Sequence, residues 1–190
     1  MAHDTEPDLD KIHLQEAYFL ESLIQNAEVG AVVLPERIAS FSRPQTRMLP
    51  MFSLERNSVS FDIMVAVTAL DADDQPLPVK GRFRLLMSYV VENLADLLQT
   101  NEQTNQQIPN IPLTISLIGA AYSTARGMII SKVSDTVLHG LSLPLRSSRQ
   151  LMQESQLSAE ELEKLLTAKV RAKETKQKPK KDSKPSKSKE

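Results

Sequence analysis

The sequence contains no cysteine and no tryptophan, and it has only five Phe and three Tyr among 190 residues. Without cysteine there is no disulfide scaffold, no thiol nucleophile and no thiolate zinc site. Because aromatic residues are scarce, the hydrophobic core must be built mainly from aliphatic side chains. The composition fits a reducing setting, and we predict a cytoplasmic location.

The motifs of catalytic and cofactor sites are missing as well. Only five glycines occur, and they form neither a phosphate-binding loop nor a nucleophile elbow around a serine. The histidines His3, His13 and His139 lie far apart, without the i, i+4 pairing of a helical metal site. We therefore predict that the protein is not an enzyme and binds no metal and no cofactor.

The chain shows no targeting or membrane segment by pattern. Its first thirty residues lack the basic, apolar and small-residue order of a signal peptide, and no apolar run reaches roughly 18 to 20 residues. The net charge of -1 hides an uneven distribution, because ten Lys and Arg face three acidic residues from Ala168 onward. We predict a disordered, solubilising Lys-rich tail over 173–190, and its lack of aromatics argues against nucleic-acid binding.

Apolar residues near the N-terminus recur at helical spacing and predict an amphipathic helix over 9–27. Together with the acidic residues before it, this helix makes an N-terminal arm over 1–28. Extended segments are predicted at 31–41 and 48–54. A hairpin is predicted from 59–70 and 79–91, joined by the turn 71–78, and one face of each arm alternates as in a half-buried strand.

The second face of this hairpin also carries apolar residues, among them Met64, Leu86 and Val90. A subunit interface or an intramolecular cover explains them more simply than a client groove, although both can hold in one oligomer. Residues 92–107 are predicted to be a connection. A long helix is then predicted from Pro112, with Asn110 as its cap.

This long helix has two further features. Its apolar stripe consists of Ile115, Ile118, Tyr122, Ala125, Ile129 and Val133. Gly119, Ala121 and Gly127 thin its other side, which indicates close packing of another element. Gly140 is predicted as the C-cap, followed by an extended Leu141, Leu143 and Leu145 segment and a final helix from Ser158.

Two of these segments resemble the SecB family of export chaperones. They are the strand 61–69, Phe-Asp-Ile-Met-Val-Ala-Val-Thr-Ala, and a long helix with Ala125-Arg126 that leads into Leu141-Ser-Leu143-Pro144. The resemblance spans about 31–152. It implies an α+β fold, a SecB-like four-stranded antiparallel sheet with a long helix packed on one face. The predicted N-terminal and C-terminal helices add to it, and 29–172 form the chaperone domain.

Three features depart from the family pattern. The family's proline pair and following asparagine are reduced to Leu143-Pro144-Leu145-Arg146, and the N-terminal helix and the basic tail have no counterpart in the export chaperone. Some relatives instead protect the antitoxin of a toxin–antitoxin pair, and this divergent sequence fits among those.

The resemblance implies an ATP-independent holdase, a homotetramer built as a dimer of dimers, whose apolar grooves bind unfolded or nascent polypeptides. Its partner is then either an exported protein, which it passes to an export motor, or an antitoxin. The candidate client-binding residues are Phe61, Ile63, Met64, Phe83, Leu85, Met87, Ile118, Tyr122, Leu141 and Leu143. The alternative is a dedicated protein–protein adaptor that binds a single partner and has no general chaperone activity.

Overall fold

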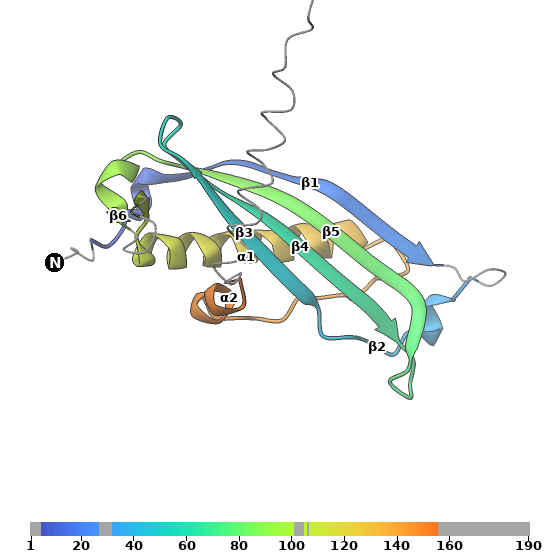
Figure 1. Ribbon diagram of the computed structural model, residues 1–190. Coiled ribbons are helices and arrows are strands. Elements are labelled where there is room, and N and C mark those ends of the chain that lie inside the picture. The colour runs from blue at the N-terminus through green and yellow to red at the C-terminus, as the bar shows by residue number, and fades with distance from the viewer. Residues whose placement is uncertain (1–4, 27–31, 101–104, 106, 156–190) are drawn as a thin grey trace, which may run out of the picture. The chain divides into compact units, whose positions relative to one another are not determined.

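The computed structural model describes residues 5–26, 32–100, 105 and 107–155. Its main element is a twisted antiparallel sheet with one long helix along one face (Figure 1). The sheet is built from β1 (Ile12–Asn26), β2 (Ser40–Phe41), β3 (Gln45–Ser53), β4 (Ser58–Leu70) and β5 (Pro76–Val91). The order across the sheet is β1, β5, β4, and both β3 and the short β2 pair with the far edge of β4.

The remaining elements are short apart from the long helix α1 (Ile111–Val133). Strands β6 (Leu98–Thr100) and β7 (Gln107–Pro109) form a small second sheet ahead of α1, and helix α2 (Ser148–Ser155) follows it. Three 3-10 helices lie at Leu9–Lys11, Pro35–Arg37 and Leu94–Leu97. The predicted α+β class is confirmed, with four long antiparallel strands and the long helix on one face.

The predicted N-terminal helix is wrong, because residues 12–26 form the edge strand β1 and only Leu9–Lys11 are helical. Strand β1 pairs with β5 along its whole length, and its register shifts between Leu14 and Glu16 and again between Phe19 and Glu21. Each shift is a β-bulge, in which two residues oppose one. The two bulges replace the strict alternation of a strand by an irregular spacing that resembles a helical one.

The predicted strand over 31–41 is also largely wrong. Only Ser40–Phe41 form a strand, since Pro35 opens a 3-10 helix in the middle of the segment. Asn26 stabilises the end of β1 by two side-chain hydrogen bonds to the backbone of Val33, which is buried. The second predicted piece, 48–54, corresponds to β3, and the hairpin of 59–70 and 79–91 corresponds to β4 and β5.

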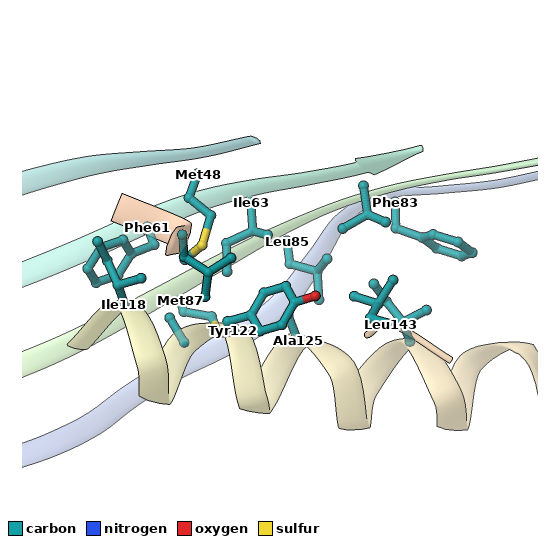
Figure 2. Packing of buried hydrophobic residues seen from close by; sticks show 14 of the residues in the cluster. Met48, Phe61, Ile63, Phe83, Leu85, Met87, Ile118, Tyr122, Ala125 and Leu143 are labelled. Carbon is teal, nitrogen blue, oxygen red and sulfur yellow. The ribbon is translucent and has the colours of Figure 1, made fainter. Parts of the chain in front are cut away.

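Helix α1 begins as predicted, because the Asn110 side chain accepts a hydrogen bond from the Leu113 amide at 3.0 Å. The same side chain donates to the Thr5 carbonyl at 3.0 Å, so it also holds the N-terminal segment. By length and composition α1 is apolar enough to cross a membrane, but core helices of soluble proteins pass the same test. Here its apolar stripe packs on the sheet through Ile118, Tyr122 and Ala125 (Figure 2).

The small residues of α1 have three different surroundings. Gly119 faces α2, since a Cβ there would lie 2.5 Å from the Ser148 hydroxyl oxygen. Ala121 is fully buried in the core, whereas a Cβ at Gly127 would meet no atom within 4 Å. The prediction of close packing is therefore confirmed at Gly119 and wrong at Gly127.

The end of α1 also differs from the prediction. The helix ends at Val133, and Gly140, with φ of 85°, closes a separate turn rather than capping α1. Helix α2 over Ser148–Ser155 was not predicted from the sequence. The predicted helix from Ser158 and the Lys-rich tail lie outside the described residues.

Candidate functional site

Strand β1 leaves one edge of the main sheet without a partner in the described chain. Two large side chains at its bulges are exposed: Leu14, which precedes the first bulge, at 48%, and Leu20, which occupies the second, at 47%. An unpaired strand edge offers a row of backbone donors and acceptors to another extended chain. The edge of β1 is therefore both apolar and able to form hydrogen bonds.

An ion pair and a histidine–glutamate hydrogen bond link β1 to β5 and to Glu92 on the open face of the sheet, which is the face opposite α1. Arg82 Nε donates to Glu21 Oε1 at 2.9 Å, and His13 Nε2 lies 3.1 Å from Glu92 Oε1. Both pairs are more than a third exposed, so each stabilises the fold only weakly. Among the described residues, no strand pairs with the outer edge of β1.

A shallow groove of about 490 Å³ runs between β1 and the C-terminal half of α1. We call it the β1–α1 groove; its lining residues are Phe19, Gly127, Met128, Ser131 and Lys132. The Phe19 ring lies 6.3 Å from the ring of Phe83, and the Lys132 ammonium lies 6.0 Å from the Phe19 centroid. The groove is open because Gly127 has no side chain to fill it.

The Leu-x-Leu-Pro segment after α1 is fixed to that helix by two side chains. The Tyr122 hydroxyl donates to the Pro144 carbonyl at 2.9 Å, and Arg126 Nε donates to the Leu143 carbonyl at 2.8 Å. Leu143 is buried, while Leu145 is 85% exposed. The segment therefore lies along apolar surface as predicted, but its first two leucines belong to the core of this chain.

Nine of the ten residues predicted to bind a client are at most 4% exposed. They are Phe61, Ile63, Phe83, Leu85, Met87, Ile118, Tyr122, Leu141 and Leu143. Figure 2 shows most of them between α1 and the sheet, with side chains directed toward one another. The tenth, Met64, is half-buried on the open face of the sheet. The structure thus brings nine together as core, and client contact by any of the ten stays a prediction.

The sequence reasoning missed the residues of the β1 edge, namely Leu14, Phe19 and Leu20. All three fall within the helix predicted over 9–27, and an edge strand with bulges gives no regular apolar period that would reveal it. The Tyr18-Phe19 pair was the available signal, because aromatic residues favour strands.

The side chains of the described residues give no sign of a metal site, since no three His, Asp or Glu among them lie close enough to share an ion.

Burial raises the pKa of Tyr89 above its usual value. The hydrogen bond and charge of Asp62 raise the pKa of Arg84.

No family model matches the chain, and no curated protein matches it. Among solved structures it is similar to the SecB-like chaperone of Mycobacterium tuberculosis, determined in complex with a ChAD peptide from the HigA1 antitoxin. The two sequences are 12% identical, the match covers 73% of this chain and 93% of that chain, and the TM-score is 0.49.

Proposed function

We propose that the protein is an ATP-independent chaperone that holds unfolded or nascent polypeptide segments in extended form. The observation that carries this proposal is the free edge of β1 beside the β1–α1 groove. A client segment would add to the sheet as a further strand along β1. Its alternate side chains would then enter the groove between Phe19 and Met128.

The chemistry of such a surface suits a holdase. Strand addition uses backbone hydrogen bonds, which every sequence except proline offers, so selectivity falls on the unfolded state rather than on one sequence. Apolar client side chains add about 25 cal/mol for each Å² removed from water. Binding of the unfolded state lowers its free concentration, and aggregation slows by mass action without any nucleotide.

The sequence resemblance further supports a homotetramer, a dimer of dimers, acting in the cytoplasm. Its client would be an exported protein or an antitoxin. The ten residues of the earlier prediction would then contact a client only if α1 moved away from the sheet, because nine of them are buried. The β1 edge needs no such movement.

The groove is tested by filling it. We expect Gly127→Leu to reduce suppression of aggregation of a denatured client severalfold, because the new side chain enters the open groove. Leu is also a better helix former than Gly, by about 0.5 to 1 kcal/mol, so the fold is retained. Ala120→Leu is the matched control, since Ala120 is exposed on the same helix outside the groove.

The β1 edge is tested by Leu20→Lys, which places a charge beside the unpaired backbone, with Leu34→Lys as the exposed control. The chaperone proposal is overturned if the wild-type protein fails to slow aggregation of the client when its oligomer and the client are equimolar. If Gly127→Leu and Ala120→Leu suppress aggregation equally well, the β1–α1 groove does not bind the client. A single partner that co-purifies at fixed stoichiometry, without aggregation suppression, supports the dedicated adaptor instead.

A further inference from the structure

The open face of the sheet carries a second feature, separate from the β1–α1 groove. Helix α1 covers the face that holds Phe61 and Leu85, and no helix of the described chain covers the opposite face. Because side chains alternate along a strand, even-numbered residues of β4 and β5 point to this open face. On β5 they include three cations in succession, Lys80, Arg82 and Arg84.

Two neighbouring rows of paired residues form a hollow on this face. The first row runs across the sheet through Leu23, Arg82, Ala66 and Gln45. The second row pairs Gln25 with Lys80 and Lys80 with Thr68. Because Ala66 and Thr68 are small, the surface sinks between the larger neighbours. The resulting hollow has a volume of about 360 Å³, and its rim is completed by Ser42.

The three cations differ in how their charges are satisfied. Arg84 is neutralised by Asp62, to which its Nε donates at 2.9 Å, and Arg82 is paired with Glu21. Lys80 has no carboxylate within salt-bridge distance among the described residues. Its ammonium is therefore the charge that the hollow presents.

The nearby acidic turn does not supply a partner for Lys80. Asp71 accepts hydrogen bonds from the backbone amides of Asp73 and Gln75, both at 2.9 Å, so its carboxylate serves the turn itself. No Asp or Glu lines the hollow. Arg82, which is paired with Glu21, also lines the hollow, and the other polar lining groups are neutral, such as Gln25 and Gln45, beside the 45% exposed Leu23.

We propose that this hollow binds an acidic polypeptide segment of a partner protein. A Glu or Asp carboxylate would pair with Lys80, and a neighbouring apolar side chain would lie over Leu23 and Ala66. Nucleic acid fits less well, because Arg82 and Arg84 are already neutralised and the hollow has no aromatic side chain on which a base stacks. This surface goes beyond the proposed holdase function, since it lies on the open face of strands β1, β5, β4 and β3 and not in the β1–α1 groove.

The experiment measures binding of a short fluorescein-labelled peptide of alternating Glu and Leu to the full chain by fluorescence anisotropy at low salt. We expect Lys80→Glu to weaken binding about tenfold, because it places like charges together. Lys80→Arg should keep the affinity. The matched control is Lys180→Glu, which changes the net charge equally but lies in the Lys-rich tail. Lys180→Glu should leave the affinity within about twofold.

Three results would overturn the proposal. They are no binding of the peptide, an equal loss for Lys80→Glu and Lys180→Glu, and tighter Lys80-dependent binding of an oligothymidylate than of the peptide. Lys80 is exposed, and thermal unfolding of Lys80→Glu checks that the fold is intact. Suppression of client aggregation should be unchanged in Lys80→Glu, so the hollow and the groove can fail independently.

Discussion

The two faces of the main sheet are made by the same strands and differ in almost every property. On β5, Leu85 and Met87 are fully buried beneath α1, while Leu86 between them is half-buried on the open face. The covered face is aliphatic and aromatic, whereas the open face mixes cations, serines and isolated apolar residues. Packing against α1 explains the apolar residues of β4 and β5 on the covered face. Such packing does not explain the composition of the open face, which must reflect solubility and binding to partner proteins.

The largest difference in stability between the two faces is expected when the consecutive residues Leu85 and Leu86 are each truncated to alanine. Leu85→Ala should lower the free energy of unfolding by about 2 to 5 kcal/mol, because it opens a cavity under α1. Leu86→Ala should cost about 0.5 kcal/mol, the usual effect at a surface position. Urea unfolding of the two variants measures the difference. An equal cost at Leu86 would show that the open face is packed against a second chain in solution.

A smaller effect is expected at Gly81, where the covered face is most crowded. A Cβ there would lie 2.7 Å from Leu138 Cδ1 and 2.9 Å from Phe83 Cε2, and both side chains are fully buried. Gly81→Ala should therefore destabilise the fold by about 1 to 3 kcal/mol, as overpacking does. Gly127→Ala is the control, and should stabilise α1 by about 0.5 to 1 kcal/mol.

The double variant of Gly81→Ala with Leu138→Ala tests the cause of that loss. If the contact with Leu138 is responsible, the two costs will be less than additive, because removing the leucine makes room for the new methyl group. Strict additivity in urea unfolding would contradict the steric explanation.

The fold was predictable where one regular period applied. The covered face of the β4–β5 hairpin is apolar at nearly every second residue, and Asn110 with Pro112 marks the start of α1, so both were found from the sequence. Strand β1 was missed because its bulges at Gln15 and Leu20 break the alternation, and an edge strand buries too little to show a clear apolar face. Only pairing with β5, which is distant in sequence, identifies it as a strand.

The candidate site was less predictable than the fold, for a related reason. Apolar residues such as Ile63 and Leu85 looked suitable for a client, but a sequence does not say whether a buried face meets α1 or another molecule. The β1–α1 groove depends on Gly127 facing no neighbour, which is a property of three-dimensional packing. The hollow at Lys80 likewise depends on the register that aligns Ala66 and Thr68 beside it.

The smallest effect on stability is expected from a comparison of hydroxyl groups on the two faces of the sheet. On the open face the Ser60 hydroxyl donates to Ser88 at 2.9 Å, whereas the Tyr89 hydroxyl on the covered face is buried and makes no hydrogen bond of good geometry, although Thr124 lies close enough to favour its phenolate. Tyr89→Phe removes that unsatisfied group, so the free energy of unfolding at pH 7 should be unchanged or higher by up to about 1 kcal/mol.

The free energies of unfolding of the wild type and Tyr89→Phe should diverge at alkaline pH. The direction of the difference follows from the raised pKa of Tyr89. Burial disfavours the phenolate, so above about pH 10, the usual value for tyrosine, the unfolded chain loses this proton before the folded chain does. The folded state then binds more protons, and stability falls as pH rises through this range. Tyr89→Phe lacks that contribution. Urea unfolding at pH 7 and pH 10.5 should therefore show a steeper loss for the wild type, and parallel losses would mean that the Tyr89 hydroxyl reaches solvent or a partner in solution.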